Sequence, residues 1–162
     1  MIVLIMGVSG VGKTTIGGLL ATALGGQYIE GDDFHPPANL AKMRAGLPLS
    51  DEDRLPWFQA LGKALRAADS KGATVVLGCS ALRESYRQLI RAFCPQCQIV
   101  WLHGSPEMVA ARIGGRHGHF MPASLLASQF AILEAPASAI QVDIDQTPEA
   151  IVKQILDQLP SG

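Results

Sequence analysis

Apolar residues occur in short runs along the chain, and glycine, proline or polar residues separate each run from the next. A short run rich in β-branched residues predicts a strand, and a run without alternating polar positions is typical of a strand covered on both faces. The predicted strands are residues 2–6, 27–30, 73–77, 98–102 and 140–145. The runs at 2–6, 73–77 and 98–102 have this apolar character, which indicates a sheet buried at its centre.

Longer segments between these runs carry apolar residues at helical spacing, which predicts helices that pack one face against the sheet. The predicted helices are residues 14–24, 38–45, 55–68, 82–93, 106–112, 122–134 and 148–159. Residues 50–54 are expected to form a polar turn before Pro56 starts the third helix. Alternating strands and helices indicate a three-layer α/β fold, in which helices cover both faces of a parallel sheet. We find no internal repeat and no linker, so residues 1–162 are predicted to form a single domain.

Composition and charge favour a small-molecule partner. The formal net charge is -1 and 17% of the residues are charged, so no basic surface for nucleic acid is expected. Every apolar run is shorter than the roughly 20 residues that span a bilayer, so no membrane association is expected. Met1 is followed directly by a predicted strand, which leaves no room for a secretion signal. We therefore expect a cytoplasmic protein.

The three cysteines, Cys79, Cys94 and Cys97, do not suggest a disulfide framework. Cys94 and Cys97 have C-x-x-C spacing, but they precede a strand instead of opening a helix, which disfavours a redox pair. A zinc site would need a second pair of ligands, and none lies at a suitable spacing. We expect reduced thiols in a surface loop.

The segment GVSGVGKT at residues 7–14 follows the first strand and matches the phosphate-loop spacing G-x-x-x-x-G-K-[ST]. Glycines let successive N–H groups turn toward an anion, and the next helix adds its free N–H groups and the positive end of its dipole. Lys13 is predicted to reach the β- and γ-phosphates of ATP, and the Thr14 hydroxyl to bind Mg²⁺. An ordinary glycine turn, the alternative, does not require Lys-Thr in this register. The predicted nucleotide-binding residues of the loop are Gly7, Ser9, Gly10, Val11, Gly12, Lys13, Thr14 and Thr15.

Acidic residues follow the second predicted strand, at the edge where the phosphate loop also lies if the two strands are parallel. The third strand ends in Gly78-Cys79-Ser80 without an aspartate, so the carboxylate that helps to hold Mg²⁺ is expected from Glu30 or Asp32. Asp32 is the candidate general base for a hydroxyl proton, and Asp33 is its competitor. Turn formation or helix capping would explain one member of this pair equally well.

Arginines follow the second and third strands, where a second substrate would lie opposite ATP. Arg54, Arg83 and Arg87 each carry a guanidinium that pairs with carboxylate or phosphate through two hydrogen bonds, which favours an anionic acceptor. A solvated helix face is the alternative for Arg83 and Arg87.

A glycine-rich segment at about residues 113–122 is predicted to form a mobile lid over the phosphate loop. Arg112 and Arg116 are placed to fold over the nucleotide in that loop. Histidines are weaker candidates for contacts with substrate hydroxyls, and we favour His35 and His119 among them.

These residues together resemble the gluconokinases, small phosphate-loop kinases that transfer a phosphoryl group from ATP to the 6-hydroxyl of D-gluconate. The resemblance covers nearly the whole chain, and the run Gly31-Asp32-Asp33-Phe34-His35-Pro36 is far more selective than the phosphate loop. The matching residues are 7–14, 31–39, 51–57, 79–82, 86–87, 118–120, 128–130 and 133–134. The resemblance implies a fold similar to shikimate and nucleoside monophosphate kinases, with a five-stranded parallel sheet, a closing lid and commonly a homodimer.

The resemblance also implies roles for single residues. Asp32 is similar to the residue that faces the acceptor hydroxyl, and Arg54 to a contact of the gluconate carboxylate or hydroxyls. Arg112 and Arg116 are similar to lid arginines, one near adenine and one reaching phosphate. The chain departs from the family pattern at residues 113–115, where the approach to the lid carries less charge, and around Arg83, which makes Arg87 the stronger substrate candidate. The full predicted set is Lys13, Asp32 and Arg116 for catalysis, Asp32, His35, Arg54, Ser80, Arg87 and His119 for substrate, and Thr14 and Glu30 for the metal.

The sequence therefore predicts an ATP- and Mg²⁺-dependent kinase that converts gluconate to 6-phosphogluconate. A related kinase that acts on shikimate, a nucleoside monophosphate or another sugar acid is the first alternative. A nucleotide-binding regulator without catalysis is the second, and the presence of Asp32 and the lid arginines disfavours it.

Overall fold

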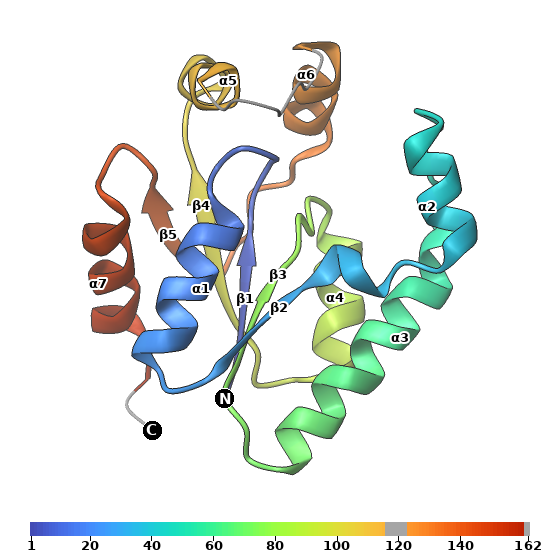
Figure 1. Cartoon of the computed structure of the whole chain (residues 1–162). Helices are drawn as coiled ribbons and strands as arrows, with labels where there is room; N and C mark the ends of the chain where they lie inside the picture. The colour runs from blue at the N-terminus through green and yellow to red at the C-terminus, as the bar shows by residue number, and fades with distance from the viewer. Residues whose placement is uncertain (116–122, 161–162) are drawn as a thin grey trace.

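Five parallel strands form one sheet at the centre of the molecule (Figure 1). The computed structural model describes residues 1–115 and 123–160. The strands are β1 (Ile2–Met6), β2 (Gln27–Glu30), β3 (Val75–Gly78), β4 (Gln98–His103) and β5 (Ile140–Asp143), in the order β2-β3-β1-β4-β5. The predicted α/β fold with a five-stranded parallel sheet is confirmed.

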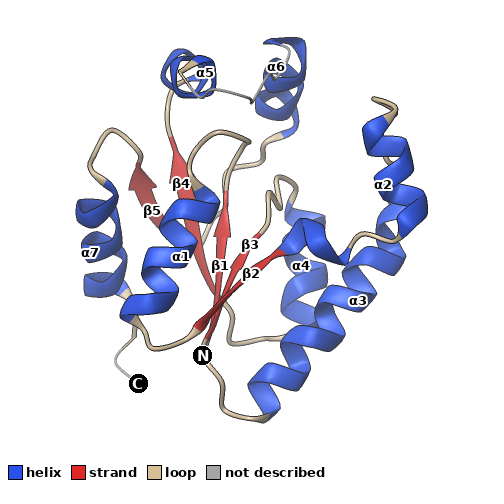
Figure 2. Ribbon diagram, in the orientation of Figure 1, coloured by secondary structure: helices blue, strands red, loops and turns tan. Residues whose placement is uncertain are grey.

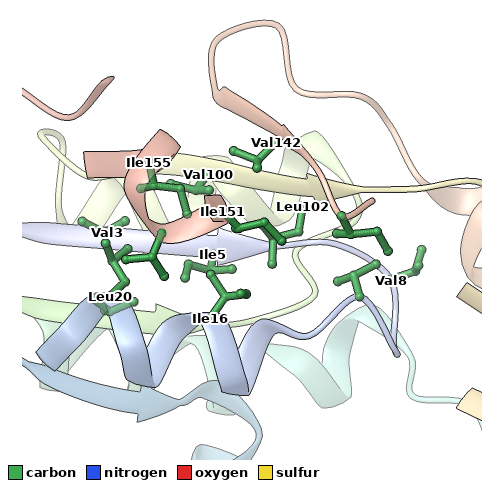
Figure 3. Close-up of a cluster of buried hydrophobic side chains, with 14 of the residues drawn as sticks. Val3, Ile5, Val8, Ile16, Leu20, Val100, Leu102, Val142, Ile151 and Ile155 are labelled. Atoms are coloured by element: carbon green, nitrogen blue, oxygen red, sulfur yellow. The ribbon is translucent and has the colours of Figure 1, made fainter. Parts of the chain in front are cut away.

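Strand β1 is buried on both faces, because successive side chains of a strand point to opposite sides. Val3 and Ile5 belong to a core with helices α1 (Lys13–Ala23) and α7 (Pro148–Gln158), as Figure 3 shows. Ile2, Leu4 and Met6 belong to a second core with helices α3 (Asp51–Ser70) and α4 (Glu84–Phe93). Since every side chain of β1 is apolar and buried, polar groups that could bind a ligand near this strand have to lie beyond its ends.

The remaining helices lie toward the carboxyl edge of the sheet (Figure 2). They are α5 (Pro106–Gly114) and α6 (Ala123–Ile132), which contact each other beyond the ends of β1 and β4, and α2 (Pro37–Arg44), which stands beside α3. A short 3₁₀ helix, η1 (Gly31–Phe34), connects β2 to α2. Within residues 1–115 and 123–160, no helix combines the length and the apolar character needed to cross a membrane.

The third helix starts earlier than the sequence pattern predicts. Helix α3 begins at Asp51, so residues 50–54 do not form a separate polar turn, and Pro56 lies inside the helix. The Asp53 N–H donates to Ser50 Oγ at 3.1 Å, and the Ser50 N–H donates to Asp53 Oδ2 at 2.9 Å. This capping box satisfies amide groups that have no partner within the helix, which makes Ser50 the start signal instead of proline.

Residues 94–97 form a loop with Pro95 and Gln96 exposed, as predicted, but the thiols of Cys94 and Cys97 do not lie at the surface. Cys94 is 2% exposed and Cys97 is 7% exposed, and both belong to the core beneath α3 and α4. Both are free thiols, as is Cys79. Burial raises the pKa of the Cys97 thiol to about 12, so this side chain is neutral and packs as an apolar group.

Tyr28 of β2 packs closely against glycines on two neighbouring elements. A Cβ atom at Gly17 of α1 would lie 2.2 Å from Tyr28 Cε2, and one at Gly78 of β3 would lie 2.1 Å from the Tyr28 hydroxyl oxygen. The ring therefore has glycine on two sides and little room to move away from either.

Replacing Gly17 with alanine is expected to destabilise the protein by overpacking, by about 1–3 kcal/mol relative to Gly18→Ala. A Cβ atom at Gly18, the next residue of α1, would meet no atom within 4 Å, so Gly18→Ala should gain up to about 1 kcal/mol of helix propensity. Urea unfolding of the two variants measures the difference. Equal stabilities would contradict this account of the contact between α1 and β2.

Candidate active site at the carboxyl edge of the sheet

The phosphate loop leaves β1 through backbone conformations that favour glycine. Gly7 has a φ of 145°, and a Cβ atom there would lie 2.5 Å from the Leu102 carbonyl oxygen of β4. Gly12 has a φ of 99° and is the N-cap of α1, with no side chain that caps the helix and no acidic residue in the first turn. The N–H groups of that turn are therefore available to an anion, in the arrangement that binds phosphate in other proteins.

Lys13 turns its ammonium group back over the loop. Its Nζ donates to the carbonyl oxygens of Gly7 at 2.9 Å and Val8 at 3.0 Å, which uses two of its three N–H donors. Burial lowers the pKa of Lys13, and the charges of Asp32 and Glu30 oppose this change. Both carboxylates thus act on the lysine of the phosphate loop, although they come from the end of β2.

Glu30 lies next to Thr14 and is held there by Tyr28. The Thr14 hydroxyl donates to Glu30 Oε2 at 3.0 Å, and the Tyr28 hydroxyl donates to the same oxygen at 2.8 Å. Burial and this hydrogen bond raise the pKa of Tyr28, so Tyr28 remains a donor. Adjacent oxygen ligands of an octahedral Mg²⁺ with bonds of about 2.1 Å lie about 3.0 Å apart, so the hydroxyl and carboxylate oxygens fit this ion in type and spacing.

Asp32 is the carboxylate that faces the phosphate loop from η1. Its side chain is 65% exposed, and its charge acts on Lys13, Tyr28, His35 and Cys79. Asp33 is also exposed but is not among the charges that shift any of these groups in the part of the chain that the structure describes. The effect of its charge on Lys13 favours Asp32 over Asp33 as the base, and the assignment stays a prediction.

The end of β3 contributes backbone contacts and a buried thiol. The Gly7 N–H donates to the Ser80 carbonyl oxygen at 3.3 Å, which connects this strand to the phosphate loop. Burial raises the pKa of the Cys79 thiol to about 12, so Cys79 is neutral and supplies no charge for a metal ion. Among the described residues of this edge, Glu30 and Asp32 remain the carboxylates near Lys13.

Two arginines lie around Tyr86 on the acceptor side. The guanidinium carbon of Arg54 lies 5.4 Å from the centre of the Tyr86 ring, and that of Arg83 lies 6.0 Å from it. The Tyr86 hydroxyl donates to Asp51 Oδ1 at 3.0 Å, which fixes the ring against α3. Arg54 also lies 3.8 Å from Asp51 Oδ1 and donates to the Leu49 carbonyl oxygen, so Asp51 offsets part of the positive charge beside this ring. The remaining guanidinium donors of Arg54 and Arg83 are of the type that binds an anionic acceptor.

Arg87 is placed differently from these arginines. It is 1% exposed, and its Nε and NH2 groups lie 2.8 Å and 2.7 Å from Glu84 Oε2. Its NH1 group donates to the carbonyl oxygens of Ala81 at 2.9 Å and Leu82 at 3.2 Å. Most of its donors are engaged within the protein, so the structure gives Arg87 a structural task beside its predicted contact with substrate.

Helix α6 and the segment after it connect the donor and acceptor sides. The Ser9 N–H of the phosphate loop donates to Gln129 Oε1 at 2.7 Å, and Gln129 Nε2 donates to Ser9 Oγ at 3.1 Å. Further along, the Glu134 N–H donates to the Leu82 carbonyl oxygen at 2.8 Å, and the Glu84 N–H donates to Glu134 Oε2 at 2.6 Å.

The predicted lid is only partly described. Arg112 lies near the end of α5, and its NH2 group donates to the Ile144 carbonyl oxygen beyond β5. Arg116 and His119 lie outside the described residues, as does most of the predicted lid at 113–122. Their predicted roles stay predictions.

Sequence reasoning assigned no role to Tyr28, Asn39 or Gln129. Gln129 and Asn39 lie in runs that resemble the gluconokinases, and this was the available signal for them. Tyr28 had no such signal, because its contact with Glu30 depends on the glycines that lie opposite its ring.

A phosphate cradle at the end of β1 with carboxylates beside it at the end of β2, on this sheet order, defines a small kinase with a phosphate loop. The family model described as shikimate kinase matches residues 9–160. The chain is 43% identical to the thermosensitive gluconokinase of Escherichia coli K12, over 93% of this chain and 83% of that protein. It is 42% identical to the gluconokinase of Arabidopsis thaliana, over 99% and 93% of the two chains.

The crystal structure of a gluconokinase from Sinorhizobium meliloti 1021 superposes with a TM-score of 0.87 at 43% identity, covering 96% of this chain and 89% of that one. The chain belongs to the gluconokinase family, within the small kinases that the shikimate kinase model describes. The predicted resemblance is thereby confirmed.

Replacing Arg87 with methionine is expected to cost more than about 2 kcal/mol of unfolding free energy, because two buried carbonyl oxygens lose their donor. The matched control is Arg91→Met. Arg91 lies one turn further along α4 and 3.7 Å from the same Glu84, but its side chain is 37% exposed, so its loss should cost less than about 1 kcal/mol. Thermal unfolding followed by circular dichroism compares the two. Similar stabilities of Arg87→Met and Arg91→Met would show that the contacts of Arg87 do not stabilise the fold.

Proposed function

We propose that the protein transfers the γ-phosphoryl group of ATP to the 6-hydroxyl of D-gluconate, giving 6-phospho-D-gluconate and ADP. Family membership supports this reaction, since relatives that share more than 40% of its residues are named gluconokinases. The observation that carries the proposal is the contact between the end of β2 and the start of α1, where the Thr14 hydroxyl donates to Glu30 Oε2 at 3.0 Å; Asp32 lies two residues further along, in η1.

On the donor side, the phosphate loop and the first turn of α1 would hold the phosphates of ATP through backbone N–H groups. Lys13 would bind the β- and γ-phosphates with the donor that the loop does not use. The predicted lid residues Arg112 and Arg116 would add positive charge near adenine and phosphate.

Thr14 and Glu30 are the residues that would hold Mg²⁺, since their oxygens are adjacent and of the type that this ion prefers. When bound, Mg²⁺ neutralises charge on the phosphates and draws electron density from the transferred group. Tyr28 keeps Glu30 in place for this role by donating to the same carboxylate oxygen.

In the transfer itself, Asp32 would accept the proton of the 6-hydroxyl while that oxygen forms a bond to the γ-phosphorus. The bond between the γ-phosphorus and the bridging oxygen breaks, and the electron pair leaves with ADP. Lys13 and Arg116 would stabilise the charge that spreads over the transferred group.

On the acceptor side, Arg54 is the proposed contact of the gluconate carboxylate, and the second guanidinium beside Tyr86, that of Arg83, supports this role. Ser80, His35 and His119 are proposed to contact hydroxyl groups of the sugar acid. Arg87 is proposed as a further contact through the second N–H of its NH2 group, since Nε, NH1 and the other N–H of NH2 are directed at Glu84, Ala81 and Leu82.

Replacing Asp32 with asparagine is expected to lower kcat by about 100-fold or more, because the amide cannot accept the hydroxyl proton. The affinity for ATP should change little. Asp33→Asn, the matched control at the neighbouring exposed carboxylate, should stay within about threefold of the unchanged protein. A coupled assay for ADP release measures both variants. Normal turnover by Asp32→Asn with a loss in Asp33→Asn would exchange the two assignments.

The choice of acceptor is tested by offering gluconate, shikimate, a nucleoside monophosphate and other aldonates in the same assay. We expect gluconate to give a kcat/KM at least about 100-fold above the others, because an enzyme site with hydrogen bonds matched to one polyol leaves polar groups unpaired with another. Turnover of a different acceptor alone would keep the mechanism and change the substrate. ATP hydrolysis that no acceptor accelerates would favour a regulatory protein.

Cellular location and oligomeric state are also part of this proposal. The three free cysteines suit a reducing compartment such as the cytoplasm. A homodimer is proposed from the family resemblance.

A further inference from the structure

His35 is held in a fixed orientation between two parts of the acceptor side. Its ring stacks on the indole of Trp57 from α3, with ring centres 4.1 Å apart and planes inclined by 21°. Trp57 is itself tied to η1, because its Nε1–H donates to the Gly31 carbonyl oxygen at 2.7 Å. His35 is 8% exposed. The plane of the imidazole is thus determined by α3, while its backbone belongs to the segment that carries Asp32.

Asn39 determines which nitrogen of this ring carries the proton. Asn39 Nδ2 lies 2.7 Å from the Asp53 carbonyl oxygen and 3.2 Å from His35 Nδ1. A carbonyl oxygen can only accept, so the NH₂ end of the amide faces it, and the second N–H of the same group is directed at Nδ1. Nδ1 is therefore the acceptor, and the neutral imidazole carries its proton on Nε2.

The protonated nitrogen is the ring atom near Asp32. His35 Nε2 lies 3.8 Å from Asp32 Oδ1, which is longer than a hydrogen bond, and the Asp32 side chain is largely exposed, so a rotation of that side chain could bring the two atoms into hydrogen-bond contact. The charged groups that act on the ring are Asp32 from η1 and Arg54 from α3. Burial lowers the pKa of His35, and Arg54 acts in the same direction while Asp32 opposes it. The ring is a neutral donor at pH 7, which can orient a carboxylate without supplying the positive charge that would make it a weaker base.

We propose that Asn39 and His35 are positioning residues that hold the Asp32 carboxylate toward the acceptor hydroxyl, a role that for His35 replaces the contact with a sugar hydroxyl. The Asn39 amide donates to His35 Nδ1, and the His35 Nε2–H is directed at Asp32. The inference rests on the proposed function, in which Asp32 is the base. An exposed aspartate on a short 3₁₀ helix has several side-chain orientations available, and a displacement of about 1 Å in a reacting group can cost about 100-fold in rate.

The first test is Asn39→Asp, which replaces the donor with an acceptor of nearly the same shape. The new carboxylate accepts from Nδ1, which moves the proton of the neutral ring to that nitrogen and leaves Nε2 as an acceptor facing Asp32. We expect kcat to fall by about 10-fold or more with the KM for ATP little changed. Nitrogen-15 NMR of the imidazole, about two pH units above the ordinary histidine pKa of ~6.5, should show the proton on Nε2 in the unchanged protein and on Nδ1 in the variant.

The second test compares His35→Gln with His35→Asn, which both lose the stacking on Trp57. Glutamine reaches about as far as Nε2 and offers an N–H toward Asp32, whereas asparagine ends near the position of Nδ1. We expect the kcat of His35→Gln to exceed that of His35→Asn by about 10-fold. Circular dichroism at the assay temperature selects conditions in which every variant is folded. His35→Gln also identifies the His35 signals in the NMR spectrum by their absence.

The outcomes separate this inference from the proposed function. If the unchanged protein phosphorylates gluconate while its neutral His35 carries the proton on Nδ1, the inference is wrong and the proposed function stands. Equal kcat values for the glutamine and asparagine variants would lead to the same conclusion. Absence of gluconate turnover together with a proton on Nε2 would mean that the proposed function has failed, and the inference would fall with it because no base needs to be positioned.

Discussion

A buried parallel sheet can offer polar groups only where its strands end. Every residue of β1 is apolar and packed on both faces, so the strand cannot carry a reactive side chain along its length. The parallel register brings the ends of β1, β2 and β3 to one edge, and backbone N–H groups, carboxylates and arginines all gather there. The position of the candidate active site is thus a consequence of how the core is packed.

The elements on the proposed acceptor side, η1 and α2, are held to the first turns of α3 by hydrogen bonds. Trp57 binds the backbone of η1, and Asn39 binds the carbonyl group of Asp53. Lys42 of α2 donates to both carboxylate oxygens of Asp53, at 2.9 Å and 2.7 Å, and these bonds help to lower the pKa of Asp53 to about 2. The same aspartate closes the capping box of α3, so one side chain sets both the start of α3 and the place of α2.

Sequence patterns were sufficient for the parts of the protein that local chemistry determines. The phosphate loop is readable because its function demands glycines and Lys-Thr at a set spacing, and the centre of the sheet because β1 and β3 are apolar and buried on both faces. The start of α3 was misplaced because Pro56 is a common first-turn residue, whereas the decisive contact joins Ser50 and Asp53. Burial of Cys94 and Cys97, and the contacts of Arg87, depend on packing between distant segments, which no local pattern records.

One stretch of chain is bonded to both substrate sides at once. Gln129 holds Ser9 of the phosphate loop, and Glu134 holds the start of α4, which carries Arg87. The last turn of α6 and the two residues after it join these contacts, so a movement of this segment away from the phosphate loop would also strain its hydrogen bonds to the start of α4. Displacement at one end of the segment is therefore coupled to displacement at the other.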